Sequence, residues 1–128
     1  MIENKPLFGK GNLNVDYAQY FIGNSYLKFL TSQADVAVNS VTFEPGARND
    51  WHVHNDGFQI LLVTDGEGWY QEAGKAPQEL KKGAVVSIAS GVKHWHGATR
   101  DSWFTHVAIG RGTTTWLESV NDAFYNEL

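Results

Sequence analysis

The amino-acid sequence predicts an all-β sandwich or barrel. Short β-prone runs recur along the chain, turn-forming segments separate them, and a helical pattern is confined to the last eight residues. The 128 residues suffice for one compact domain, and 42% hydrophobic against 19% charged residues is the balance of a globular protein. We therefore expect one domain over residues 17–128, preceded by an irregular N-terminal arm over residues 1–16.

Eight or nine runs have the composition of strands. In chain order they are SYLKFLT (25–31), VAVNSVTF (36–43), WHVH (51–54), FQILLVT (58–64), GWYQEA (68–73), AVVSIA (84–89), KHWHGA (93–98), WFTHVAI (103–109) and TTTWLESV (113–120). Separators such as EPGARND (44–50) and DGEG (65–68) contain the residues that turns require. The final segment NDAFYNEL (121–128) predicts a short helix capped by Asn121 or Asp122.

All five histidines lie on three of these predicted strands. Side chains two residues apart share a face of a strand, so three sets arise: His52 with His54, His94 with His96, and His106 with Phe104 and Ala108. If the strands are neighbours in a small barrel, every imidazole faces one interior volume. Paired histidines on a strand can also be ordinary half-buried polar residues, so spacing alone leaves two readings open.

Glycines frame the first histidine pair. Five residues follow Gly46 before His52 and His54, and Gln59 and Gly66 then follow after four and six residues.

A second frame lies further along the chain. Five residues separate Gly83 from Ala89, which is followed by Ser90 and Gly91, and His94 comes two residues later. The two frames resemble the two motifs of the cupin family in order and spacing. Gln59 stands in place of the family's glutamate, Ala89 in place of a proline, and Ala98 in place of an asparagine.

This resemblance implies a jelly-roll β-barrel, also called a double-stranded β-helix, with metal ligands His52, His54, Gln59 and His94. Neutral imidazole and amide groups suit one divalent transition metal among Mn, Fe, Ni, Co and Zn, with Mn favoured. Gln59 could instead orient a neighbouring group. As a ligand, an amide in place of a carboxylate leaves the cation with its full charge, which predicts a stronger Lewis acid.

The resemblance extends from VTFEPGAR (41–48) to WLESV (116–120). In this range the chain is similar to small single-domain bacterial cupins of the carboxymuconolactone-decarboxylase-like or associated subgroup, which includes manganese-dependent hydroxynitrile lyases. That similarity implies a proton-transfer role for His106. Gly110 stands where those lyases carry glutamine, and the spacing from the histidine pair to Gln59 is one residue longer.

Two histidines fall outside the implied ligand set. His106 is the candidate catalytic acid or base, with a hydrogen bond to a ligand as the alternative; His96 is expected to play a supporting role at the pocket. Strand parity predicts further pocket residues at Asn39, Val41, Phe43, Leu61, Phe104 and Ala108. These side chains would form a small, mostly apolar cavity for a compact small-molecule ligand without several phosphates.

Three tryptophans lie opposite the interior positions. Trp51, Trp95 and Trp103 are expected to point out of the barrel, where together they would form an apolar patch. A homodimer would cover this patch, or the terminal segments of the same chain would do so. The homodimer is the prediction.

Composition excludes several classes of protein. A net charge of −4 with scattered basic residues disfavours nucleic-acid binding, and the absence of cysteine excludes disulfides and thiolate ligands. The apolar run ILLV (60–63) is too short to cross a bilayer. We expect a cytoplasmic protein with no membrane association.

Together these features predict a metalloenzyme acting on a small oxygenated organic molecule. Its chemistry would be of lyase, decarboxylase or isomerase type, through polarisation of a carbonyl or alkoxide. One alternative is a non-catalytic cupin that binds or senses a small molecule or metal. A dioxygenase is the second alternative.

Overall fold

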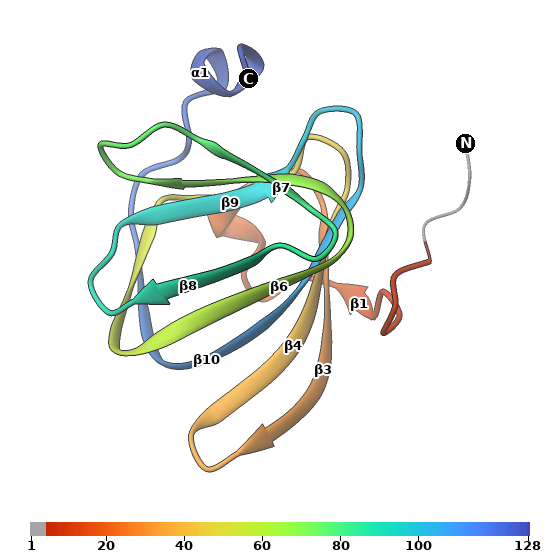
Figure 1. Ribbon diagram of the computed structural model, residues 1–128, viewed down its shortest axis with the longest axis vertical. Coiled ribbons are helices and arrows are strands. Elements are labelled where there is room, and N and C mark those ends of the chain that lie inside the picture. The colour runs from red at the N-terminus through yellow and green to blue at the C-terminus, as the bar shows by residue number, and fades with distance from the viewer. Residues whose placement is uncertain (1–4) are drawn as a thin grey trace.

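The computed structural model describes residues 5–128 and confirms the all-β fold (Figure 1). The strands are β1 (Asn12–Leu13), β2 (Phe21–Ile22), β3 (Ser25–Gln33), β4 (Val36–Phe43), β5 (Arg48–Asn49), β6 (His52–Glu72), β7 (Gln78–Lys81), β8 (Val85–Ala89), β9 (His94–Ala98) and β10 (Phe104–Trp116). A 3₁₀ turn, η1 (Ala18–Tyr20), precedes β2, and the helix α1 (Asp122–Asn126) ends the chain. Across residues 5–128, neither helical segment has the length and apolar character that crossing a membrane demands.

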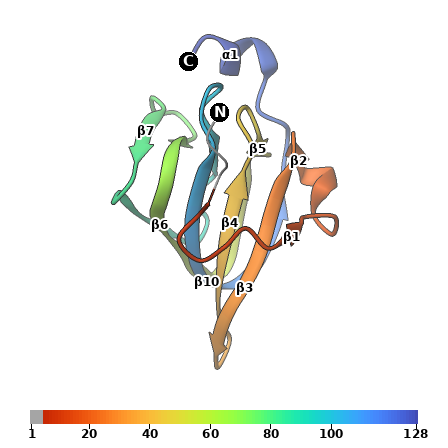
Figure 2. The ribbon, with the colours of Figure 1, turned by 90° about the vertical axis from the view of Figure 1, so that its right-hand side faces the viewer.

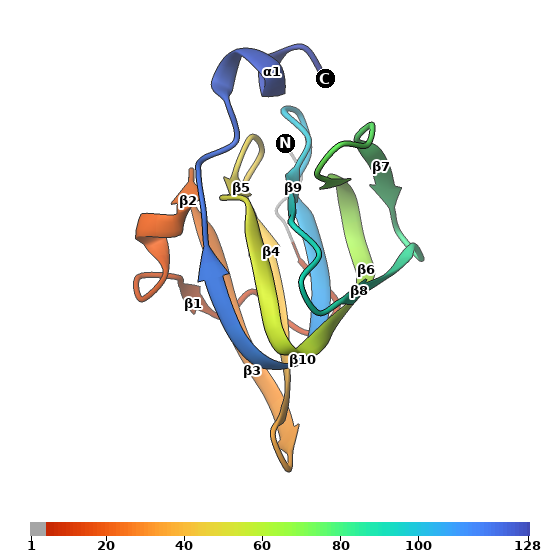
Figure 3. The same ribbon diagram turned by 90° about the vertical axis from the view of Figure 1, so that its left-hand side faces the viewer.

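One curled sheet contains all the strands. Its order is β1-β3-β4-β10-β6-β9-β5-β2, and β7 and β8 also pair with β6. Neighbours are antiparallel; β6 and β9 pair in this way over residues 68–72 and 94–98, and one further bridge joins His52 at the start of β6 to His94. Figure 1 shows the sheet closing around an interior, with the β3–β4 hairpin projecting beyond the body. Figure 3 shows α1 beyond the ends of β5 and β9.

The N-terminal arm is more regular than predicted. Its first four residues, 1–4, lie outside the described part of the chain. Residues 12–13 form β1, which pairs with Tyr26 and Leu27 of β3 (Figure 2). The arm therefore begins the sheet.

The predicted break at residues 65–68 is wrong, because β6 runs through it. Gly66 has φ 72°, and a Cβ there would lie 1.8 Å from the Trp103 carbonyl oxygen. The pairing with β10 shifts register between Thr105 and His106, opposite this region. A β-bulge thus bends β6 so strongly that His52 and Glu72, at its two ends, both pair with His94 of β9. The three runs between residues 51 and 73 are one strand, and the last two predicted strands are likewise joined in β10.

The interior is an apolar core beneath the sheet. Its buried members are Val41, Phe43, Ala47, Leu61, Val63, Tyr70, Leu80, Val86, Ile88, Ala98, Phe104 and Ala108. Most of them come from inward positions of β4, β6, β8 and β10. Leu80 lies on β7, Ala98 on β9 and Ala47 just before β5.

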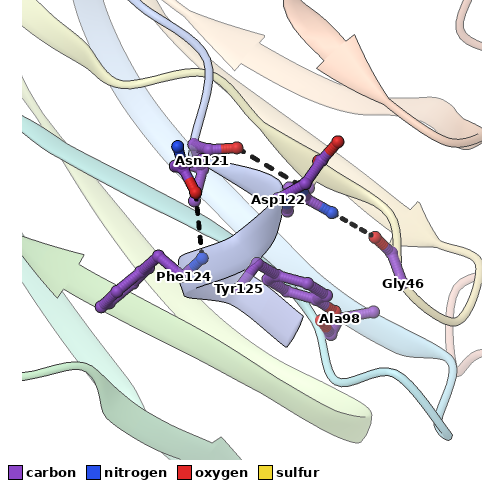
Figure 4. A network of polar contacts seen from close by, with 8 residues as sticks. Gly46, Ala98, Asn121, Asp122, Phe124 and Tyr125 are labelled. Carbon is purple, nitrogen blue, oxygen red and sulfur yellow. Dashed lines mark hydrogen bonds and ion pairs between the residues drawn. The ribbon is translucent and has the colours of Figure 1, made fainter. Parts of the chain in front are cut away.

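The C-terminal helix is attached to the barrel by specific contacts (Figure 4). The side chain of Asn121 caps it by accepting a hydrogen bond from the Phe124 N–H at 3.0 Å, which confirms the predicted cap. The Tyr125 hydroxyl donates to the Ala98 carbonyl at 2.5 Å. Arg48 pairs with Asp122, and its guanidinium lies 4.0 Å from the centre of the Tyr125 ring.

This helix changes the interpretation of the tryptophans. Trp95 is fully buried in a cluster with Val120 and Tyr125, against which Trp51 also packs. Trp103 lies beside the arm, with the Lys10 ammonium 5.5 Å from its ring centre. The C-terminal segment of the same chain therefore covers Trp95, and this tryptophan no longer requires a second copy. The homodimer stays a prediction.

Candidate metal centre

Strands β6 and β9 bring three histidines together. His52 and His54 alternate along β6 and so point inward, and a bridge between β6 and β9 places His52 beside His94. The ring centres of His52 and His94 are 4.1 Å apart. One ring nitrogen from each of the three histidines lies within 4.8 Å of the other two.

Backbone carbonyls orient two of these rings. The Nδ1–H of His52 donates to the Asp50 carbonyl and that of His94 donates to the Val92 carbonyl, each at 2.8 Å. The proton on Nδ1 leaves the Nε2 lone pair free, which is the arrangement found for metal-bound histidine. Nε2 of His94 is buried and contacts no hydrogen-bonding group among residues 5–128. An orphaned imidazole nitrogen facing two other imidazoles fits a bound cation.

His54 and Gln59 complete the set predicted as ligands. Nε2 of His54 lies 3.0 Å from Oε1 of Gln59, while Nδ1 lies 3.3 Å from the Thr114 hydroxyl. Two ligand atoms at right angles around a metal, each about 2.1 Å from it, are about 3 Å apart. The hydrogen-bonded pair is therefore spaced as two adjacent ligands would be.

Burial keeps these imidazoles neutral. Desolvation, reinforced by His94, lowers the pKa of His52 well below its usual value, and it lowers the pKa of His94 to about 4. The pKa of His54 is also lowered by burial. Neutral imidazole is the form that ligates a metal, so the site is ready for a cation at neutral pH.

The other two histidines extend the cluster. The rings of His96 and His106 are 4.8 Å apart, and both side chains are buried. The side-chain oxygen of Asn49 accepts a hydrogen bond from the backbone N–H of His96 at 2.9 Å. The side-chain nitrogen of Asn49 lies 3.3 Å from Nε2 of His96. Burial lowers the pKa of His96 well below its usual value. All five imidazoles thus form one contiguous group.

His106 lies in an apolar environment. Its ring is 5.7 Å from that of Phe43 and 5.6 Å from that of Phe104. Neither ring nitrogen has a hydrogen-bond partner within the described chain. Burial lowers its pKa to about 4, and the nearby Val107 backbone offsets part of this shift without reaching hydrogen-bonding geometry. His106 is therefore neutral at pH 7 and free to accept a proton.

A cavity of about 360 Å³ opens onto the cluster. Its lining includes these residues predicted from strand parity: Asn39, Val41, Phe43, His96, His106 and Ala108. Leu61 and Phe104 are not on its wall; both lie in the apolar core. Parity predicts the face of a strand on which a side chain lies; it does not predict the depth at which the cavity ends.

Several site residues were missed by the sequence analysis. Thr114 approaches His54, Asn49 approaches His96, and the Trp116 ring lies 4.7 Å from that of His52. Tyr17 and Phe21, from the segment before β3, also line the cavity. Strand alternation places Thr114 and Trp116 on one face, but only the pairing of β10 with β6 places that face beside the histidines.

Comparison with known proteins identifies the family. A family model described as "Cupin domain" matches residues 39–114. The (R)-mandelonitrile lyase of Granulicella tundricola is 44% identical over 115 residues, which cover 84% of this chain and 87% of that protein. The crystal structure of a cupin-like protein from Thermotoga maritima superposes with TM-score 0.86 at 41% identity, covering 94% of this chain and 95% of the other.

A more distant structure agrees in fold. A predicted oxalate decarboxylase from Thermotoga maritima superposes with TM-score 0.70 at 20% identity, covering 81% of this chain and 95% of the other. The matched motifs, the curled sheet and the buried histidines lead to one conclusion: the chain belongs to the cupin family.

Proposed function

We propose that this cupin is a metal-dependent lyase acting on a small hydroxy or carbonyl compound. The observation that carries the proposal is Nε2 of His94, which has no hydrogen-bond partner in the described part of the chain and lies near His52 and His54, two residues of the cavity wall. The resemblance to an (R)-mandelonitrile lyase supports the reaction class.

His52, His54 and His94 would hold the metal, with Gln59 as a fourth ligand. A divalent transition metal, with Mn favoured, would supply Lewis acidity that lowers the pKa of a substrate hydroxyl and polarises a carbonyl oxygen. The ligand set adds no negative charge, since the three imidazoles are neutral and the fourth group is an amide. The site therefore favours oxygen anions.

His106 would move the proton. With an α-hydroxynitrile as substrate, the imidazole takes the hydroxyl proton as the C–C bond to the nitrile breaks. The bonding electron pair leaves with cyanide, and the carbonyl double bond forms. Burial lowers the pKa of His106 to about 4, so its imidazolium readily passes the proton on to cyanide, which gives hydrogen cyanide.

The cavity wall suits a compact apolar substituent. Phe21, Val41 and Phe43 line it beside the histidines. Apolar walls exclude water from the reacting groups, which strengthens the electrostatic interactions within the site.

The test separates metal binding from catalysis. Protein loaded with Mn, Fe, Ni or Zn is screened for cleavage of cyanohydrins and for cyanide addition to aldehydes, with metal content measured in parallel. We expect His52→Asn to lose metal and activity together, and His106→Gln to keep metal and lose activity. Saturable ligand binding without product under any metal would instead identify a binding module.

A further inference from the structure

A second cavity reaches the proposed metal ligands from another side. Its volume is about 210 Å³, and it lies between β4, β6 and the bend in β10. It shares five wall residues with the central cavity: Asn39, His54, Gln59, Ala108 and Thr114. The two cavities therefore meet at His54 and Gln59.

Position 110, on the wall of this cavity, has no side chain. Gly110 pairs with Gln59 across the sheet and lines the second cavity. A Cβ on Gly110 would lie 2.8 Å from the Phe58 carbonyl oxygen and 3.6 Å from the Gln59 Cα. Glycine at this position therefore avoids a close contact with the backbone of β6.

Two charged residues line this cavity, Asp35 and Arg111. The positive charge is carried by Arg111. This residue pairs with Phe58, one position from Gln59 in the register, and its guanidinium carbon lies 6.0 Å from the Phe58 ring centre. Its ion pair with Asp35 is long, at 3.4 Å, and both side chains are partly exposed. Such a pair contributes little, and a guanidinium has five N–H donors. Donors on Arg111 are therefore available to another anion.

We infer that the substrate carries a carboxylate that binds Arg111 while its oxygenated carbon lies at His54 and Gln59. The inference rests on the proposed function and narrows its substrate class to small hydroxy- or oxo-carboxylates. A planar guanidinium recognises a carboxylate through paired hydrogen bonds. The central cavity then holds the remainder of the substrate against its apolar wall.

The experiment compares two aldehydes of matched length. Succinic semialdehyde carries a carboxylate and butanal does not; dissociation constants for both are measured by calorimetry on Mn-loaded wild-type protein, Arg111→Gln and Arg111→Lys. We expect the carboxylate to tighten wild-type binding about tenfold. The ratio of the dissociation constant of butanal to that of succinic semialdehyde should fall to about one in Arg111→Gln. In Arg111→Lys it should stay above one but below the wild-type ratio.

A second pair of variants tests the cavity itself. Ala37 lines the second cavity and is not part of the wall of the central one. Ala37→Phe should abolish the carboxylate preference while leaving butanal binding unchanged, and Ala37→Ser is its matched control.

Two outcomes would overturn the inference. If wild type and Arg111→Gln prefer succinic semialdehyde over butanal to the same degree, the carboxylate binds elsewhere. If neither aldehyde binds wild type, this site is excluded. Either result is distinct from failure of the proposed function, which is the absence of lyase turnover in metal-loaded wild type.

Discussion

Replacing His106 with leucine should stabilise the metal-free protein while removing the proposed proton carrier. The imidazole is fully buried, and its two nitrogens find no partner in the described structure. An unpaired buried polar group destabilises a fold by about 1–3 kcal/mol. Leucine is similar in volume and has no polar atom. We expect His106→Leu to raise the free energy of unfolding at pH 7 by about 1 kcal/mol.

Acid should enlarge this gain. Burial lowers the pKa of His106 from 6.5 to about 4, so below pH 6.5 the unfolded chain binds a proton that the folded chain does not. Wild-type stability is then lost as pH falls from 6.5 towards 4. Over the 1.5 pH units down to pH 5, this one histidine contributes a loss of about 2 kcal/mol. The advantage of His106→Leu should therefore grow to about 3 kcal/mol at pH 5.

Urea unfolding with chelator present, followed by tryptophan fluorescence at pH 7 and pH 5, measures both effects. His106→Gln is the matched control: it also lacks the titrating group but keeps a buried polar side chain. It should share the weaker pH dependence of His106→Leu without the gain at pH 7. Parallel pH profiles for wild type and His106→Leu would refute the reasoning, because they would mean that the folded imidazole titrates normally.

Four further predictions concern the metal, the supporting contacts and the C-terminal helix. Mn²⁺ at about 100 times its dissociation constant should raise the free energy of unfolding by about 2.7 kcal/mol, as measured by urea unfolding, and His94→Ala should abolish this gain. Thr114→Val should weaken Mn²⁺ binding about tenfold in a calorimetric titration, because it removes the hydroxyl beside Nδ1 of His54. Trp95→Ala should lower the free energy of unfolding by about 3–5 kcal/mol in urea, since the indole is fully buried. Tyr125→Phe should lower the same quantity by about 1 kcal/mol through loss of its hydrogen bond to a backbone carbonyl.

Three of these predictions have a control or a contrary result. Metal stabilisation that persists in His94→Ala would place the cation elsewhere. Thr113→Val, one residue away on an exposed position, should leave Mn²⁺ affinity unchanged. Val85→Ala is the control for Trp95, because Val85 is 65% exposed. Equal losses in the Val85 and Trp95 variants would show that α1 does not cover the indole in solution.

The histidine cluster was predictable because strand alternation has a short and strict period. Residues two apart must share a face, so His52 with His54 and His94 with His96 could be paired from their spacing alone. The glycine frames added the order and separation typical of cupins. Contacts between distant segments followed no such rule. The approach of Thr114 to His54 depends on the register of β10 against β6.

The sequence alone determined the β architecture, the capped C-terminal helix and the inward face of each histidine strand, because alternation and capping are local properties of a few neighbouring residues. Tertiary structure decided which strands adjoin, where the cavity ends and what covers Trp95. It also decided that Nε2 of His94 has no hydrogen-bond partner among residues 5–128. These features arise from packing between segments tens of residues apart, for which local periodicity carries no information.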